Sequence, residues 1–402
     1  MNRLLKRVLI ISLVLIPAIS ILFFIDSKQQ NYKDIRDSEK QEEKVNSGEP
    51  FVDFRDDTLI GRTDSSDSSC SNCGTQLELS QILKVKQTAW IPPWDYKNGI
   101  ESFKRFESQF HSISPVTFQI NNDGTLTQRI DPNLKDLKEI AIQKNTKLIP
   151  SIGNFDSNLM KNIFDSPDNT QRHIQSIVQT VQTYEYDGID LDYESIQPSN
   201  KDAFLDFVKK LSIELKKNNK ILSVTVMSKW GDDVMYTGSP GTRAVQDWTI
   251  IGQWADEVRI MAYDFTPLSS SKEGPIAPIG WVERVLQYAV EKIPPEKVWL
   301  GVPLYSYEWV MPTKDSEEVK IRTNSYTYNV VKSKILVHDY VDIKYDEEYQ
   351  EGYAEYKCLE NYFCIIFYST PESVKARKGL AEKYNIAGVA YWRLGGEDEL
   401  ID

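Results

Sequence analysis

Histidine is scarce in this chain of 402 residues, which holds only His111, His173 and His338. None of the three lies near a G-x-S-x-G or an H-E-x-x-H pattern, so the sequence disfavours a Ser-His hydrolase and a zinc peptidase. A G-x-G-x-x-G pattern after the first apolar run is also missing, which disfavours a dinucleotide site. We therefore expect no cofactor.

Cysteine is limited to two close pairs, Cys70/Cys73 and Cys358/Cys364. A zinc site at the first pair would need two further ligands at suitable spacing, and none is near. We expect a local disulfide or free thiols there, and no metal. The second pair flanks a short turn-like stretch and could staple a hairpin in a compartment that allows disulfides.

Positive charge is in deficit, with 47 Lys and Arg against 59 Asp and Glu and a net charge of -12. Phosphate binding needs clustered basic side chains, and no basic stripe appears outside the extreme N-terminus, so we expect no nucleic-acid partner. The content of 41% hydrophobic and 26% charged residues is that of a globular chain long enough for one large or two medium domains.

A long apolar run occurs at residues 8–25, directly after three basic residues. Its length is about the minimum for spanning a bilayer, and the basic flank should stay cytoplasmic. A cleaved signal peptide is the alternative, but such a peptide has a shorter apolar region and ends in small residues, whereas this run ends in Leu-Phe-Phe-Ile. We predict a transmembrane anchor at 1–26 with the rest of the chain outside the cell membrane, or a secreted protein if the segment is cleaved.

Residues 27–82 are polar and charged, with few bulky apolar side chains. Because such a segment cannot offset its ordering entropy, we predict a flexible stalk there and one folded domain at 83–402. Within that domain, short continuous apolar runs alternate with amphipathic helical patterns, as parallel strands buried on both faces do. The predicted strands are Thr88–Ile91, Val116–Ile120, Lys147–Ile152, Gly188–Leu191, Leu222–Met227, Val258–Tyr263, Val298–Leu304 and Gly388–Trp392.

Eight strands alternating with helices predict an α/β fold, the (β/α)8 TIM barrel, with an open doubly wound sheet as the rival. Helices are expected at 201–217 with Ser199 as N-cap, from Trp281 to Ile293, and from Pro371 behind Thr370. The stretch after the seventh strand is too long for a loop. We expect a small α+β or all-β insertion there at about 306–367, with strands at 337–342 and 363–368.

The most informative pattern is DGIDLDYE at residues 187–194. Strand residues alternate between faces, so Asp190, Asp192 and Glu194 share one face. Three carboxylates on a buried face repel one another, so at least one must be protonated or share a proton, which is how a general acid is held ready at neutral pH. An exposed acidic edge or a calcium loop is the alternative, although a calcium loop has Gly-rich turns between its ligands. We predict that Glu194, the outermost, is a general acid.

The pattern resembles the D-x-x-D-x-D-x-E signature of glycoside hydrolase family 18, the chitinase-like barrels. Residues 261–264, Met-Ala-Tyr-Asp, resemble the M-x-Y-D motif of the family, and residues 390–392, Ala-Tyr-Trp, resemble the end of its eighth strand. The resemblance covers about 86–396 and is strongest to the bacterial branch with spore-cortex-lytic and spore-germination hydrolases. The chain departs from the S-x-G-G that is frequent after the third strand of the family, because it has Ser-Ile-Gly-Asn at 151–154.

The resemblance implies a retaining mechanism in which the substrate's own N-acetyl carbonyl attacks the anomeric carbon. Glu194 would protonate the glycosidic oxygen. Asp192 would hydrogen-bond the acetamido N–H, and Asp190 would tune Asp192 by sharing a proton. Tyr263 would hold the acetamido carbonyl in attacking position.

The resemblance also implies a set of substrate-binding residues. Asp187 would support the motif from beneath, Met261 would line the acetamido pocket, and Asp264 would hold the sugar. Trp392 would stack beneath the sugar, or else cap the barrel core. Four more aromatic residues could extend a sugar groove or belong to the core or rim: Trp90, Phe118, Trp230 and Trp248.

The implied substrate is a β-1,4-linked polysaccharide or oligosaccharide that contains N-acetylglucosamine: chitin, chito-oligosaccharides or peptidoglycan. A non-catalytic, lectin-like protein on the same barrel is the alternative, which the presence of Glu194 and all three aspartates disfavours. A cell-surface scaffold that binds no glycan is the third possibility.

Overall fold

The computed structural model describes residues 85–106, 110–232, 242–313, 321–360 and 362–401. The predicted anchor, the predicted stalk and the Cys70/Cys73 pair lie outside these residues. Among the described residues, none of the helices combines the length and the apolar character that a bilayer crossing requires.

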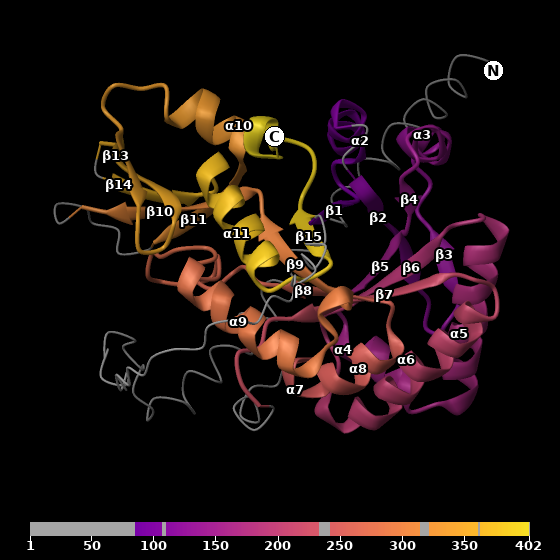
Figure 1. The fold of residues 1–402 in the computed structure, drawn as a ribbon. Coiled ribbons are helices and arrows are strands. Elements are labelled where there is room, and N and C mark those ends of the chain that lie inside the picture. Colours follow the sequence, from indigo (N-terminus) through magenta and orange to yellow (C-terminus); the bar gives the residue numbers. More distant parts are fainter. Residues whose placement is uncertain (1–84, 107–109, 233–241, 314–320, 361, 402) are drawn as a thin grey trace, which may run out of the picture. The chain divides into compact units, whose positions relative to one another are not determined.

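Eight parallel strands form a closed barrel (Figure 1), because β1 pairs with β2 on one side and with β15 on the other. The predicted TIM barrel is therefore confirmed, and the open sheet is wrong. In spatial order the barrel strands are β1 (Lys86–Ile91), β2 (Phe110–Ile120), β5 (Ser151–Asn154), β6 (Gly188–Tyr193), β7 (Ile221–Met227), β8 (Glu257–Met261), β9 (Val298–Pro303) and β15 (Gly388–Trp392).

Most strands differ from their predicted bounds by one or two residues at an end, and two differ more. β2 begins earlier than predicted, at Phe110. The prediction missed its first half because Ser112 and Ser114 interrupt the apolar pattern, although both are buried. The predicted third strand divides into β4 (Lys147–Leu148) and β5 around Pro150, whose nitrogen has no hydrogen to donate to a neighbouring strand. A short β3 (Leu126–Gln128) adds to β2 in antiparallel fashion.

The helices that alternate with these strands are α2 (Tyr96–Arg105), α3 (Leu137–Gln143), α4 (Ser157–Phe164), α5 (Pro167–Thr183), α6 (Lys201–Lys216), α7 (Thr242–Val245), α8 (Trp248–Trp254), α9 (Ile279–Lys292) and α11 (Pro371–Lys383). Thr370 caps α11 as predicted, since its hydroxyl accepts a hydrogen bond from the Ser373 N–H at 3.1 Å. The predicted cap of α6 is wrong: Ser199 lies in a short 3-10 turn, and Asn200 precedes the helix without a side-chain cap bond.

The predicted insertion after the seventh barrel strand is confirmed as an antiparallel sheet of order β11-β10-β14-β13-β12. Its strands are β10 (Tyr305–Pro312), β11 (Arg322–Thr327), β12 (Asp342–Asp346), β13 (Glu351–Leu359) and β14 (Tyr362–Tyr368), with a short α10 (Tyr328–Val330) and a π-helical turn at Val331–Ile335 between β11 and β12. The strand predicted at 363–368 is confirmed as β14. The one predicted at 337–342 is wrong, because residues 337–341 form turns and β12 begins only at Asp342.

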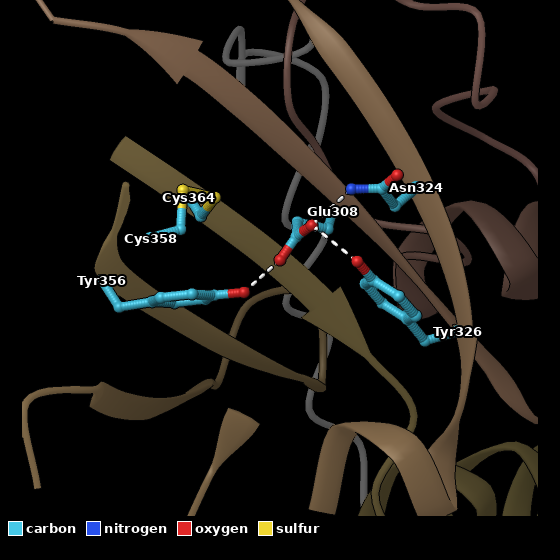
Figure 2. Close-up of a disulfide and its surroundings, with 6 residues drawn as sticks. All are labelled: Glu308, Asn324, Tyr326, Tyr356, Cys358 and Cys364. Carbon is cyan, nitrogen blue, oxygen red and sulfur yellow. Dashed lines mark hydrogen bonds between the residues drawn. A yellow bond between two sulfur atoms is a disulfide. The ribbon is translucent and has the colours of Figure 1, made fainter. Parts of the chain in front are cut away.

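A disulfide joins β13 to β14 between Cys358 and Cys364, with a Cα–Cα distance of 5.7 Å (Figure 2), so the predicted staple is confirmed. Near it the buried carboxylate of Glu308 accepts hydrogen bonds from the Asn324 amide at 2.7 Å and from two tyrosine hydroxyls. These donors satisfy a buried carboxyl group inside the sheet, so Glu308 serves the stability of the insertion.

Candidate active site

The three carboxylates of the row occupy successive levels of the barrel interior. Asp190 is fully buried within β6, Asp192 is 6% exposed one level above it, and half-buried Glu194 follows the carboxyl end of the strand. The alternation predicted from the sequence therefore places them on one face. The opening of a TIM barrel at its carboxyl ends is where catalytic residues gather.

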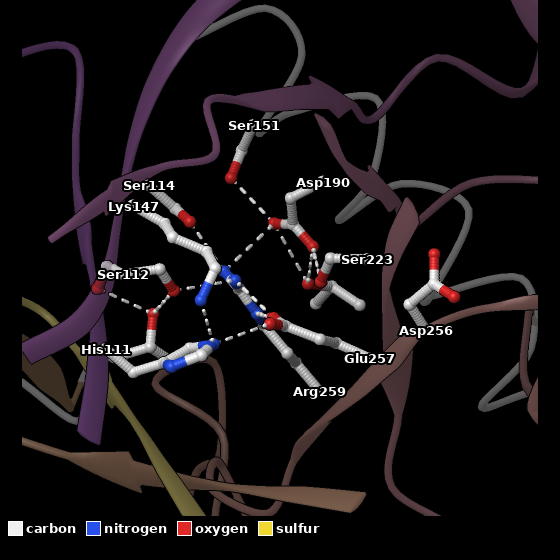
Figure 3. A network of polar contacts seen from close by, with 12 residues as sticks. His111, Ser112, Ser114, Lys147, Ser151, Asp190, Ser223, Asp256, Glu257 and Arg259 are labelled. Carbon is white, nitrogen blue, oxygen red and sulfur yellow. Dashed lines mark hydrogen bonds and ion pairs between the residues drawn. The ribbon is translucent and has the colours of Figure 1, made fainter. Parts of the chain in front are cut away.

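Asp190 is held by four donors from three other barrel strands, and Figure 3 shows Ser151 and Ser223 among them. Its Oδ1 accepts from the hydroxyls of Ser223 at 2.7 Å and Thr225 at 3.1 Å. Its Oδ2 accepts from the Ser151 hydroxyl at 2.6 Å and from the Trp90 indole at 3.0 Å. Among the described residues no hydrogen bond joins Asp190 to Asp192, so the predicted sharing of a proton stays a prediction.

The two outer carboxylates favour their protonated forms. Burial, and then the negative charge of Asp264, raise the pKa of Glu194 to about 7. Burial, and then the charges of Glu194 and Asp190, raise the pKa of Asp192 well above its usual range. The Oδ1 atom of Asp192 is buried without a hydrogen-bond partner among the described residues. This end of the barrel thus offers both a proton near neutral pH and an unsatisfied polar atom.

Met261 ends β8, and Tyr263 follows it at the mouth of the barrel. Burial, and then the nearby charges of Asp192 and Glu194, raise the pKa of Tyr263 well above its usual range. A phenol in this setting keeps its proton and acts as a hydrogen-bond donor. Tyr263 therefore lies close to the carboxylate row, two residues after Met261.

Asp264 adopts a left-handed backbone conformation, with φ of 58°, which aspartate tolerates better than most residues. Its Oδ1 accepts hydrogen bonds from the hydroxyls of Tyr305 and Tyr307, the latter at 2.8 Å. Loss of hydration raises the pKa of Asp264, and the two hydroxyls act against that rise. Sequence reasoning missed this role of the two tyrosines, although their spacing on β10 places them on one face.

Trp392 ends β15 and is partly exposed, so it is not a fully enclosed core residue. Its ring lies edge-to-face with Trp90 at 6.1 Å and with Trp94 at 6.2 Å. Trp94, which sequence reasoning did not single out, is 61% exposed. Of the four aromatic residues considered for a groove, Trp90, Phe118 and Trp248 are buried and belong to the core, and Trp230 packs beside Trp281.

Asp187 precedes β6 and lies at the opposite end of that strand from Glu194. Its carboxylate accepts a hydrogen bond from the Leu148 N–H at 2.8 Å, which ties β4 to the start of β6. This position fits support of the motif from beneath, but it does not fit the direct contact with a substrate for which Asp187 was also considered.

The departure at residues 151–154 also lies beside the row. The carbonyl of Asn154 accepts a hydrogen bond from the Glu194 N–H at 2.9 Å, and the Asn154 side chain turns to the Asp156 carbonyl at 3.1 Å. Asn154 therefore helps to fix the backbone of Glu194. In the part of the chain that the structure describes, no group of three or more His, Cys, Asp or Glu side chains could hold a metal ion.

Known proteins resemble this chain in sequence over most of its length. A family model described as Glycosyl hydrolases family 18 matches residues 94–397. The Uncharacterized glycosylase YvbX of Bacillus subtilis (strain 168) is 26% identical over 304 residues, covering 74% of this chain and 84% of that protein. The Cortical fragment-lytic enzyme of Bacillus anthracis is 28% identical over 294 residues, covering 70% of this chain and 64% of that enzyme.

Solved structures share the fold. The spore cortex-lytic enzyme SleL of Bacillus cereus has a TM-score of 0.69 at 24% identity, covering 79% of this chain and 72% of that chain. A chitinase from Chromobacterium violaceum ATCC 12472 has a TM-score of 0.70 at 20% identity, covering 79% of this chain and 96% of that chain.

Proposed function

This chain belongs to glycosyl hydrolase family 18 and is a glycosidase, and from that premise we propose that it cleaves β-1,4-linked glycans containing N-acetylglucosamine by a retaining, substrate-assisted mechanism. The observation that carries this proposal is the buried Oδ1 of Asp192, which has no partner among the described residues. A buried acceptor without a donor costs free energy, and an acetamido N–H supplies that donor.

Binding of the acetamido group also decides where the proton lies. Asp192 and Glu194 repel one another, so the two carboxyls together hold one proton near neutral pH. A hydrogen bond from the substrate N–H favours the charged form of Asp192. The proton is then left on Glu194, at the outer end of the row, where the glycosidic oxygen arrives.

The reaction follows from this arrangement in two steps. Glu194 donates its proton to the glycosidic oxygen while the bond from that oxygen to the anomeric carbon breaks, and the acetamido carbonyl oxygen bonds to the same carbon. Water then attacks the anomeric carbon of the oxazolinium and gives its proton to the Glu194 carboxylate, while the bond between that carbon and the acetamido oxygen breaks and the N-acetyl group re-forms. Two displacements at one carbon retain its configuration.

The remaining side chains hold the sugar. Tyr263 keeps its proton and donates to the acetamido carbonyl, which holds that oxygen near the carbon it attacks. Met261 lines the acetamido pocket. Asp264, fixed by two tyrosines, binds sugar hydroxyls, and the partly exposed ring of Trp392 lies beneath the apolar sugar face.

Among the candidate substrates we place the glycan of a bacterial cell wall first and chitin second. The support is the similarity to the Cortical fragment-lytic enzyme of Bacillus anthracis, which matches over 70% of this chain. Product analysis on purified peptidoglycan beside chitin oligomers separates the two.

The test of the mechanism is Glu194→Gln. We expect hydrolysis of both substrates to fall by at least about a hundredfold, because general acid catalysis contributes on that scale, while glycan binding persists. If wild type and variant are equally active, Glu194 is not the acid. Glycan binding without hydrolysis by wild type would make the protein a lectin. Inversion of the anomeric configuration, measured by NMR, would exclude the N-acetyl nucleophile.

We further propose that the catalytic domain lies outside the cytoplasm, attached to the membrane by residues 1–26. The Cys358–Cys364 disulfide supports the compartment, since disulfides persist in oxidising surroundings. The anchor rests on the sequence alone. Protease treatment of intact cells tests the proposal: the domain should be degraded while a cytoplasmic marker survives, and protection of the domain would contradict it.

A further inference from the structure

A fully buried arginine lies inside the barrel, directly behind the carboxylate row. Arg259 belongs to β8, and Nη1 of its guanidinium lies 3.9 Å from Oδ2 of Asp190 (Figure 3). A permanent positive charge without exposure to solvent is costly unless it is paired. The groups that contact the Arg259 guanidinium therefore indicate its role.

Three polar side chains hold the guanidinium in place. Glu257 accepts from Nη2 at 2.7 Å and from Nε at 3.2 Å. Ser114 accepts from Nη1 at 2.6 Å, and Ser112 from Nη2 at 3.3 Å. The Trp90 ring covers one side at 5.6 Å. The guanidinium is thus fixed between the carboxylates of Glu257 and Asp190.

The ionisable groups that face Arg259 can be named strand by strand. β6 presents Asp190 and β8 presents Glu257, while β2 presents His111, whose Nε2 lies 3.4 Å from the Glu257 carboxylate. β1 contributes only an indole, and the residues paired with Arg259 on β7 and β9 are Thr225 and Trp299, which carry no charge. Lys147 reaches His111 at 3.5 Å.

Glu257 is the nearer of the two carboxylates to the guanidinium, at 2.7 Å against 3.9 Å for Asp190. Burial acts to raise the pKa of Glu257, but the charges and hydrogen bonds of Arg259 and His111 lower it to about 2. Into the barrel mouth, the carboxylate of Glu257 is followed by the guanidinium of Arg259 and then by the carboxylate of Asp190. Asp192 and Glu194 follow, and these two favour their protonated forms.

We infer that Arg259 is a positioning residue: its guanidinium holds Asp190 in the ionised state, so that the single proton of the row is left to Asp192 and Glu194. The four neutral donors on Asp190 orient it, and the cation behind it fixes its charge. Without that cation Asp190 competes for the proton that the general acid needs. The catalytic consequence rests on the proposed function, whereas the charge relationship does not.

The test is a double-mutant cycle between Arg259→Met and Asp190→Asn in the Glu257→Gln background, which avoids leaving Glu257 buried without its partner. The thermal midpoint is measured from pH 4.5 to 8 without substrate. Once Arg259 is replaced, the buried charge of Asp190 has no partner. That charge destabilises the fold at high pH, where the carboxyl is ionised, and not at low pH, where the carboxyl is protonated. Arg259→Met should therefore lower the midpoint by about 3 °C more at pH 8 than at pH 4.5.

Two further variants separate charge from packing. In the Asp190→Asn background the pH-dependent part of the loss should vanish. Arg259→Lys, which keeps the charge, should restore the pH dependence of the parent. Three results would show that Arg259 only fills space. The midpoint could fall equally at both pH values, its pH-dependent fall could persist in the Asp190→Asn background, or Arg259→Lys could show the same fall as Arg259→Met.

The same proteins are assayed for hydrolysis. We expect Arg259→Met to lower kcat/KM about tenfold, and to lower it no further once Asp190 is replaced. If the parent hydrolyses no N-acetyl glycan while the thermal cycle behaves as expected, the proposed function fails and the charge relationship stands. If hydrolysis is normal and the thermal cycle shows no coupling, the inference about Arg259 is wrong.

Discussion

The hydroxyl of Tyr307 lies 2.8 Å from Oδ1 of Asp264. Tyr307 belongs to the antiparallel insertion and Asp264 follows barrel strand β8, so this bond and its neighbour from Tyr305 tie the insertion to the candidate active site. The charge of Asp264 in turn contributes to the raised pKa of Glu194. The insertion therefore acts on Glu194, the proposed general acid, through one carboxylate.

Tyr307→Phe should move the basic limb of the pH profile to lower pH. Burial raises the pKa of Asp264, and the hydrogen bond from the Tyr307 hydroxyl lowers it. Loss of that hydroxyl therefore raises the pKa of Asp264 further and leaves Asp264 less charged near neutral pH. A weaker negative charge raises the pKa of Glu194 less, and Glu194 then loses its proton below pH 7. We expect a downward shift of about half a pH unit in kcat, with a higher KM.

The matched control is Tyr326→Phe, which removes a hydroxyl that donates to Glu308 at 3.0 Å within the same sheet. This variant should lower the thermal midpoint without moving the pH profile. Equal shifts in both variants would mean that the effect comes from loosening of the sheet.

Glu194→Gln should stabilise the protein above neutral pH. A carboxyl whose pKa is raised from 4.5 to about 7 contributes stability below pH 4.5, and this contribution is lost as the pH rises through 7. Glutamine stays neutral throughout, so at pH 8 the variant should gain on the order of 2 kcal/mol over wild type and nothing at pH 4.5. Unfolding at the two pH values measures this gain. Glu139→Gln, at an exposed position of α3, is the control and should gain nothing at either pH.

The barrel and the carboxylate row could be predicted because both depend on local patterns. Eight apolar runs indicated the strands, and the period of two placed Asp190, Asp192 and Glu194 on one face. Buried polar residues inside the barrel strands did not follow the rule that buried strands are apolar runs. Ser112 and Ser114 concealed the first half of β2, and the predicted strand at 258–263 was taken as an apolar run although Arg259 lies within it.

Contacts between distant segments could not be predicted in this way. Tyr305 and Tyr307 meet Asp264 across 41 and 43 positions of sequence, a contact that the folding of the insertion creates. Trp90 was considered for the groove because the sequence gives no sign of its hydrogen bond to Asp190, which lies 100 positions away. A charged residue inside an otherwise apolar strand was the usable signal, since burial of a charge demands a partner.

The Cys358–Cys364 disulfide should stabilise the insertion modestly. It closes a loop of sequence separation 6, for which the entropy of the unfolded chain predicts about 2 kcal/mol. Cys358→Ala together with Cys364→Ala should therefore lower the thermal midpoint by a few degrees, and a reducing agent should do the same to wild type alone. Cys70→Ser with Cys73→Ser is the control. An unchanged midpoint in the first variant would show that the sheet does not depend on its staple.

Trp94→Ala should weaken the binding of long substrates while it spares the chemistry. The Trp94 ring is 61% exposed and lies 6.2 Å from Trp392, so the two indoles present neighbouring apolar surfaces at the mouth of the barrel. An exposed ring adds little to folding, and its loss should leave the thermal midpoint within about 1 °C. A sugar placed on it contributes equally in the ground and transition states, so KM for long oligosaccharides should rise about tenfold at constant kcat. Short oligosaccharides that reach only Trp392 should show no change.

Phe155→Ala, 63% exposed beyond β5, is the matched control on another strand end. If Trp94→Ala raises KM for short and long substrates alike, the ring supports Trp392 and holds no sugar of its own.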